Sequence, residues 1–199
     1  MPINLVDNGN NNTVIIDAQT KSRCSGIIIL NGDNNYVNIQ EWVNSYEFMM
    51  DIGHNCSIFV GKNAQLARLN IYAKHDSTIN IGENTGFTNK AVLHAAESFD
   101  ISIGRNCIIA DGFFATVSDL HSIIDINTNT RLNYGKDITI EDRVWIAESV
   151  RLLKGSHIGA GSIVGIGSIV TGAIPQNCLA TGVPASVRKT QVTWDYRLL

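Results

Sequence analysis

The C-terminal half of the chain reads Ile140-Glu-Asp-Arg-Val-Trp, Ile146-Ala-Glu-Ser-Val-Arg, Leu152-Leu-Lys-Gly-Ser-His, Ile158-Gly-Ala-Gly-Ser-Ile, Val164-Gly-Ile-Gly-Ser-Ile and Val170-Thr-Gly-Ala-Ile-Pro. An aliphatic residue begins each block, and a small residue or Val usually follows four positions later. A fixed period of six residues is typical of a parallel β-helix, in which each coil packs on its neighbours. The stretch therefore predicts a stacked β-helical solenoid.

The same pattern continues upstream in a looser form. An aliphatic-Gly-x-Asn phrase begins at Ile52, Val60, Ile81 and Ile103. Gly and Asn both accept left-handed backbone conformations, so we expect these phrases at the corners between strands. The aliphatic residues on either side alternate with polar ones, which places one face of each strand in the core. Each interval of about 20 residues is interpreted as one coil of three short strands.

No sustained helical stripe occurs before residue 186, so the predicted class is all-β, a left-handed parallel β-helix with one protruding loop. We expect a single domain over residues 1–187, with imperfect coils in 1–50 and a loop insertion at about 118–137. Two of the three prolines, Pro175 and Pro184, lie at and beyond the end of the last regular block and indicate where the solenoid ends. Residues 188–199 are expected to form a tail that covers the open end or packs on a neighbouring subunit.

Composition excludes several classes of function. A net charge of −3 argues against a nucleic-acid surface. The N-terminus lacks a basic start followed by an apolar run, and no apolar run reaches membrane-spanning length. We therefore expect a cytoplasmic protein. The four cysteines have no zinc-ligand spacing and are interpreted as reduced core residues; they are Cys24, Cys56, Cys107 and Cys178.

The six-residue period fails between Ala115 and Lys136, where the insertion begins with Asp119-x-His121. Loops on a rigid scaffold often carry binding and catalytic residues. Residues two apart in an extended chain point the same way, so the carboxylate can fix one imidazole nitrogen and leave the other as a base. The alternative is a solvated loop histidine with an acid nearby by chance, because Asp-x-His is a weak motif.

Longer motifs carry a resemblance to a known family. The segments Val144-Trp145-Ile146-Ala147, Leu153-Lys154-Gly155, Ile158-Gly159-Ala160-Gly161-Ser162 and Gly167-Ser168-Ile169-Val170-Thr171 resemble the hexapeptide-repeat acyltransferases, which are left-handed β-helices that use acetyl-CoA. Ser118-Asp119-Leu-His121, followed by Arg131-Leu-Asn133-Tyr-Gly135-Lys136 and Trp145, looks most like the bacterial surface-polysaccharide O-acetyltransferases. The match covers residues 101–189, and its specific part is 107–155.

The resemblance implies catalytic roles for three residues. His121 is expected to take the proton from a sugar hydroxyl, and Asp119 to orient it. Trp145 is expected to donate its indole N–H to the oxyanion or to help hold the acyl donor, since that group can only donate. Direct attack by the hydroxyl needs no acyl-enzyme. The alternative for Trp145 is an exposed aromatic residue that fills a corner.

The resemblance also implies binding residues and an assembly. The pantetheine arm of acetyl-CoA is expected along a groove between subunits of a homotrimer, at Ala147, Gly165, Ile166, Thr171 and Gly172. Lys154, Arg188 and Lys189 are candidates for its phosphates, although each could equally belong to a solvated face. Arg131 and Asn133 are expected to contact the acceptor or to order the loop. No metal is expected.

Other functions share the fold. The enzyme could acetylate another small molecule, such as an amino sugar or an antibiotic, or the chain could be a non-catalytic scaffold. The γ-class carbonic anhydrases bind zinc through histidines that include two placed five residues apart, and no histidine pair here has that spacing. The main hypothesis is an acetyl-CoA-dependent O-acetyltransferase that acts on a surface polysaccharide or its precursor.

Overall fold

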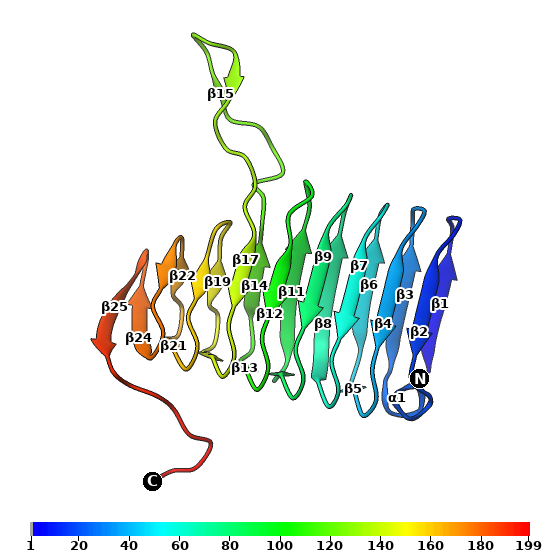
Figure 1. Cartoon of the computed structure of the whole chain (residues 1–199), viewed down its shortest axis with the longest axis horizontal. Helices are drawn as coiled ribbons and strands as arrows, with labels where there is room; N and C mark the ends of the chain where they lie inside the picture. The colour runs from blue at the N-terminus through cyan, green and yellow to red at the C-terminus, as the bar shows by residue number, and fades with distance from the viewer. Residues whose placement is uncertain (1) are drawn as a thin grey trace.

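The computed structural model describes residues 2–199 as an all-β solenoid of parallel coils stacked along one axis (Figure 1). The predicted left-handed β-helix is confirmed. The solenoid has three faces, and within each face the strands of successive coils pair in parallel. Short loops at the corners join one face to the next.

Face A consists of β1 (Ile3–Asp7), β3 (Gly26–Leu30), β6 (Phe48–Ile52), the second half of β8 (Gln65–Ala73), β11 (Lys90–Ala95), β14 (Phe113–Thr116), β19 (Arg151–Leu152) and β22 (Ile169–Val170). Face B consists of β2 (Thr13–Ile16), β4 (Tyr36–Ile39), β7 (Ser57–Val60), β9 (Thr78–Ile81), β12 (Ile101–Ile103), β17 (Ile138–Ile140), β20 (His157–Ile158) and β23 (Ala173–Ile174).

Face C consists of β5 (Asn44–Ser45), the first half of β8, β10 (Gly86–Phe87), β13 (Ile108–Ile109), β18 (Trp145–Ile146), β21 (Ile163–Val164) and β24 (Cys178–Gly182). The last strand, β25 (Ala185–Thr190), folds back antiparallel to β24. Strand β8 turns the corner between faces C and A without a break, and Ala67 adopts a positive φ of 47° there.

The core is a set of columns of identical or similar side chains. Ile58, Ile79, Ile101 and Ile138 lie in direct register on face B, and all four are buried. Each side chain packs on the coils before and after it, so a coil is stable only within the stack. The four cysteines lie in this core as free thiols, as predicted.

The corners follow the sequence phrases. The asparagine of each aliphatic-Gly-x-Asn phrase has φ between 56° and 58°; these residues are Asn55, Asn63, Asn84 and Asn106. Their amides also bond from coil to coil: Asn63 donates to Asn84 at 3.1 Å, and Asn55 donates to Asp76 at 2.8 Å. Asparagine therefore supplies both the left-handed conformation and a hydrogen bond along the corner.

One element was not predicted. In the first coil a short helix, α1 (Ala18–Arg23), stands where later coils have a strand of face C. Asp17 caps it by accepting hydrogen bonds from the backbone N–H groups of Gln19 and Thr20. A helix of six residues is too short for a periodic apolar stripe, so only this capping signal was present in the sequence. Within residues 2–199 no helix is long and apolar enough to cross a membrane.

Candidate functional site

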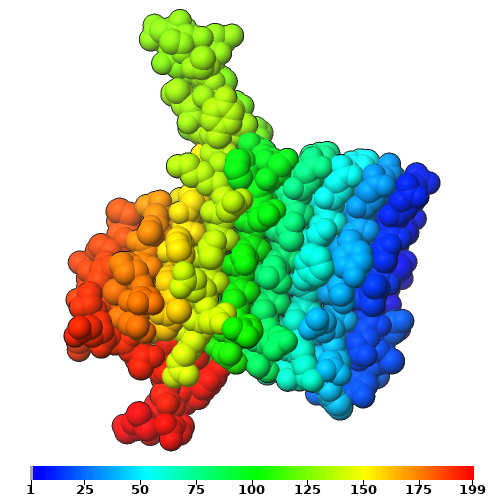
Figure 2. Space-filling model, in the orientation of Figure 1, coloured from blue at the N-terminus to red at the C-terminus, as the bar shows by residue number. Residues whose placement is uncertain are grey.

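The chain between β14 and β17 leaves the corner between faces A and B as a long arm (Figure 1). Figure 2 shows the arm standing clear of the body. Its outer part is a hairpin of β15 (Ile124–Asp125) and β16 (Thr130–Arg131). Asp125 closes the hairpin by accepting the backbone N–H groups of Asn127 and Thr128 at 2.8 and 3.2 Å. The six-residue period fails over this same stretch.

Asn133 fixes the root of the arm. It is only 8% exposed, and its side-chain amide is fully used. The oxygen accepts the N–H of Ile123 at 2.7 Å. The nitrogen donates to Asp119 Oδ2 at 2.7 Å and to the backbone oxygen of His121 at 2.8 Å. In this structure the Asn133 amide is engaged within the loop, which agrees with the expected ordering role; contact with an acceptor stays a prediction.

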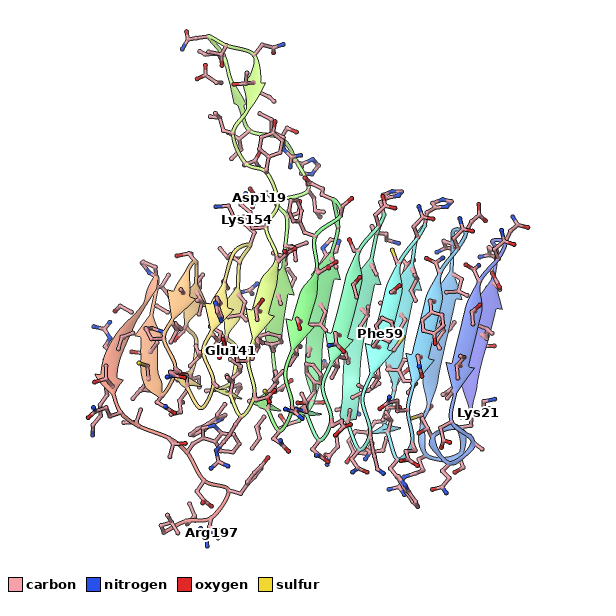
Figure 3. The ribbon with its side chains drawn as sticks, viewed as in Figure 1. Lys21, Phe59, Asp119, Glu141, Lys154 and Arg197 are labelled. Carbon is pink, nitrogen blue, oxygen red and sulfur yellow. The ribbon has the colours of Figure 1, made fainter. Side chains whose placement is uncertain are left out.

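Asp119 faces the body of the solenoid. Its carboxylate accepts from Lys154 Nζ and from the Asn133 amide, and Figure 3 shows Asp119 and Lys154 side by side at the root. The Lys154 ammonium, followed by the Asn133 amide, holds the pKa of the Asp119 carboxyl below its usual value. This differs from the expectation that Asp119 orients the His121 ring. The Lys154 ammonium, which is expected to meet a phosphate of acetyl-CoA, is paired with Asp119 here, and its contact with a phosphate stays a prediction.

Arg131 is held by a residue that the sequence did not single out. Its guanidinium makes a two-pronged ion pair with Glu97, with distances of 2.7 Å to Oε2 and 2.9 Å to Oε1. Ser118 donates its hydroxyl to the same carboxylate. Arg131 and Ser118 together lower the pKa of Glu97. Arg131, like Asn133, is therefore engaged in contacts within the protein, and its expected contact with an acceptor stays a prediction. Glu97 lies 34 residues before Arg131, so no local pattern could have revealed the pair.

His121 lies just beyond this root, and it is exposed to solvent. The Asn133 amide holds its backbone oxygen, so the main chain at His121 is fixed while the imidazole is open to a partner. An exposed imidazole on an ordered main chain can accept a proton from a hydroxyl that approaches it.

Trp145 lies on β18 of face C, between Ile108 and Ile163 of the neighbouring coils, and is 41% exposed. In a three-sided solenoid, face C lies opposite the corner between faces A and B, where the arm leaves the body. The structure therefore does not bring His121 and Trp145 of one chain to the same side. Trp145 instead packs near Trp194 of the C-terminal tail, with ring centroids 6.4 Å apart.

The expected cofactor residues fall into three groups. Ala147, Gly165 and Ile166 follow β18 and β21 at the corner between faces C and A, whereas Thr171 and Gly172 follow β22 at the corner between A and B. Arg188 and Lys189 lie exposed on β25.

Two of these positions leave room for a ligand. Ile166 exposes 70% of its surface. A β-carbon added at Gly172 would meet no atom within 4 Å, and φ there is not left-handed, so the fold itself does not require glycine. An exposed apolar side chain and a bare stretch of backbone suit a thin, partly apolar ligand. Over residues 2–199 no three His, Cys, Asp or Glu side chains are grouped as metal ligands would be.

Known proteins with similar sequences are acetyltransferases. The chain is 36% identical over 135 residues to the polysialic acid O-acetyltransferase of Escherichia coli O1:K1, which covers 68% of this chain and 43% of that protein. The chain thus spans less than half the length of that relative. It is 32% identical over 158 residues to a putative lipopolysaccharide biosynthesis O-acetyl transferase of Escherichia coli K12, which covers 64% of this chain and 80% of that protein. The sequence matches no protein-family profile.

The fold is also similar to a solved structure over nearly its whole length. The crystal structure of the polysialic acid O-acetyltransferase OatWY superposes with a TM-score of 0.87 at 26% identity. The superposition covers 98% of this chain and 92% of that protein.

Proposed function

The chain belongs to the hexapeptide-repeat O-acetyltransferases, and on this premise we propose that it moves an acetyl group from acetyl-CoA to a sugar hydroxyl of a bacterial surface polysaccharide or its precursor. The observation that carries the proposal is the arm root, where His121 stands exposed on a main chain fixed by Asn133. The named activities of the similar proteins support the acceptor class.

In the proposed reaction, His121 is the general base. The sugar hydroxyl gives its proton to the imidazole while its oxygen attacks the thioester carbonyl carbon of acetyl-CoA. The new C–O bond forms, the C–S bond breaks, and the proton passes from the imidazolium to the departing thiolate. A positioned base supplies about 10²–10⁴-fold in rate. No Ser or Cys nucleophile is needed, and all four cysteines are buried.

Asp119 is proposed to hold the arm in place rather than to contact the His121 ring directly. It is a positioning residue, because its carboxylate ties the arm to Lys154 of the body and to the Asn133 amide that holds the His121 backbone. Trp145 supplies an N–H that donates to the oxygen on which negative charge develops. The thioester chain follows the exposed surface of Ile166 and the bare backbone at Gly172, and Arg188 and Lys189 meet the phosphates.

We propose a homotrimer, and two features support sites that are shared between copies. His121 and Trp145 of one chain lie on opposite sides, so a site that uses both needs two chains. The arm also carries large apolar side chains in solvent, including Ile126 at 94% exposure, together with Leu132 and Tyr134. Such a patch on a projecting arm is stabilised when it packs on a neighbouring subunit.

A direct assay tests the proposal. The full chain is incubated with acetyl-CoA and bacterial surface polysaccharides or their oligosaccharides, thiol release is followed, and the product is examined by NMR. We expect acceptor-dependent release of CoA thiol and an O-acetyl ester on a sugar carbon. If the product carried acetyl only on nitrogen, or if no sugar increased thiol release, the proposal would be wrong.

A further inference from the structure

The C-terminal tail is clamped against face C. After β25 the chain reverses and runs back beneath the body (Figure 1). Trp194 is 7% exposed, and its indole N–H donates to the backbone oxygen of Arg143 at 2.8 Å. The Arg143 guanidinium donates to the Trp194 oxygen at 3.0 Å and lies 5.5 Å above the indole ring. A pair of reciprocal hydrogen bonds and a cation–π contact therefore fix the tail here.

The clamp aligns three aromatic rings. Trp145, the proposed oxyanion donor, lies 6.4 Å from Trp194, and Trp194 lies 5.0 Å from Tyr196 in an edge-to-face arrangement. Arg197, the next residue along, points away from the body (Figure 3). Tyr196 is 69% exposed even though it is held by this cluster. Its ring is therefore fixed in place and still open to a ligand.

Tyr196 forms one wall of a groove of about 360 Å³ on face C. This volume falls in the range of small-molecule sites, about 300–1,000 Å³. The groove is lined by side chains of successive coils and of the tail, among them the amides of Asn44, Gln65 and Asn84 and the exposed rings of Tyr46 and Tyr196.

The groove leads towards Trp145. Gln65, Gly86, Ile108 and Trp145 are successive partners in one outward column of face C, and both Gly86 and Ile108 line the groove. Neighbouring strands of a sheet lie about 4.8 Å apart. The groove therefore ends one strand from the indole, so a chain molecule bound in it would present its next unit to Trp145.

Gly86 supplies a second observation. A β-carbon at this position would make only ordinary contacts, the nearest 3.7 Å away on the Gln65 side chain, and φ is not left-handed. Neither crowding nor backbone conformation requires glycine, and a β-branched or long residue would suit the strand better. A side chain here would fill the floor of the groove. The absence of one keeps the groove open.

The lining has the chemistry of a carbohydrate site. Amides both donate and accept hydrogen bonds, which matches sugar hydroxyls, and aromatic faces pack on the apolar faces of sugar rings. No Asp, Glu, Lys, Arg or His lines the groove as described over residues 2–199. An anionic sugar would lose its hydration there without gaining a cation.

We propose that this groove binds a neutral sugar unit of the acceptor chain next to the reacting unit, with the clamped tail as its wall and Tyr196 as its stacking platform. The inference rests on the proposed acetyl transfer for its orientation towards Trp145. It adds that the acceptor is an oligomer or polymer with an uncharged unit beside the acetylated one.

Two variants of the full chain test it: Tyr196→Ala, which removes the platform, and Gly86→Leu, which fills the floor. Phe59→Ala is the matched control, because it removes an exposed ring from face B (Figure 3). Thermal unfolding of all three shows whether the fold is kept. We expect both groove variants to raise the KM for neutral oligosaccharide acceptors about 10-fold, which is about 1.4 kcal/mol. The KM for acetyl-CoA and all constants of Phe59→Ala stay unchanged.

Binding is measured separately, without acetyl-CoA, on an array of neutral and sialylated glycans. We expect the wild type to retain neutral oligosaccharides and the groove variants to lose them, a result that stands even if no acetyl transfer is found. The inference is overturned if folded Tyr196→Ala and Gly86→Leu keep the wild-type acceptor KM and glycan binding. It is also overturned if only sialylated glycans bind. Failure of acetyl transfer by the wild type on every acceptor refutes the proposed function instead.

Discussion

At the scale of single residues, one buried amide sets the geometry of the arm root. Asn133 holds the backbone of His121 and the carboxylate of Asp119 at once, so the two residues of the Asp-x-His motif meet through a third. The sequence placed both motif residues correctly at the start of the insertion. It could not show that Asp119 would pair with Lys154, because the two residues are 35 apart in the sequence and lie close together only in the folded solenoid.

The first prediction concerns His121. Replacing it by alanine removes the proposed base and leaves the arm root intact, because Asn133 bonds to the backbone oxygen at this position. We expect His121→Ala to lower kcat by about 10²–10⁴-fold with little change in the KM for acetyl-CoA. Steady-state thiol-release kinetics measure this.

His157→Ala is the control for that variant. The His157 ring is exposed like that of His121, but it lies on face B, where it pairs with Glu141 at 2.7 Å. Its loss should leave kcat unchanged. Equal activity of His121→Ala and the wild type would refute the general-base role.

The second prediction concerns pH. Arg131 and Ser118 lower the pKa of Glu97, so this carboxylate stabilises the arm root at pH values above its ordinary unfolded pKa, about 4.3. The contribution is lost as the pH falls through the folded pKa, because the protonated acid no longer pairs with Arg131. The protection factor of the Ile123 amide, which is the slowing of its exchange corrected for the intrinsic effect of pH, should therefore fall in acid.

Glu97→Gln gives the matched comparison, because it keeps the size of the side chain and removes its charge. We expect a lower protection factor at neutral pH in this variant and a flatter dependence of that factor on pH. A wild-type protection factor that did not change between neutral and acidic pH would contradict this account.

At the scale of elements, the corners were the most predictable part of the fold. A corner must turn within about two residues, which calls for a left-handed backbone, and the aliphatic-Gly-x-Asn phrases mark the sites directly. Other corner residues with positive φ, such as Trp42 and Arg143, carry no such mark. Helix α1 escaped prediction for a similar reason, since six residues packed on one coil need only Asp17 as a cap.

The third prediction tests a corner. Asn55 has a φ of 56°, accepts an amide N–H from Asn34 at 3.1 Å, and donates to Asp76 at 2.8 Å. Asn55→Ala places a β-carbon in the left-handed region and removes both bonds, so we expect a loss of about 1–2 kcal/mol in the free energy of unfolding. Chemical denaturation measures it.

Asn55→Gly separates the two causes, because glycine accepts the left-handed conformation without strain but still loses both hydrogen bonds. It should cost less than the alanine variant. If the glycine variant were the less stable of the two, backbone conformation would not be the reason for asparagine at this corner.

At the scale of the whole molecule, the solenoid and its family could be read from the repeat, while the route of the chain after β25 could not. A tail was expected near residue 188. Its path could not be predicted, because the contact between Trp194 and Arg143 joins residues 51 apart through side chains that belong to no repeat. The same holds for the separation of His121 from Trp145. The resemblance to a known family indicated both residues. Their positions on opposite sides of the body follow from the arrangement of the strands in the three faces.

The fourth prediction follows from that separation. If each site takes His121 from one copy and Trp145 from another, then His121→Ala and Trp145→Ala are each inactive alone. Mixed assemblies of the two variants contain some sites in which both side chains are intact, about a quarter of them for random mixing in a closed ring. We expect thiol-release activity to return when the variants are dissociated together and reassembled.

Light scattering of the same mixtures reports the assembled mass, which should be that of three chains. Each variant reassembled alone controls for residual activity. Mixtures that remained as inactive as the separate variants, while assembled, would show that a site does not draw on two copies.

The reversed strand β25 has a consequence for solubility. A stack of parallel rungs presents the backbone N–H and C=O groups of its final rung to any passing chain, which is the usual route to fibre growth. Because β25 runs antiparallel to β24 and continues into the clamped tail, it occupies that edge along face C with a strand of the wrong polarity for another rung. The molecule therefore covers the face C part of its final edge, and the strand that does so leads directly into the tail proposed to receive a sugar.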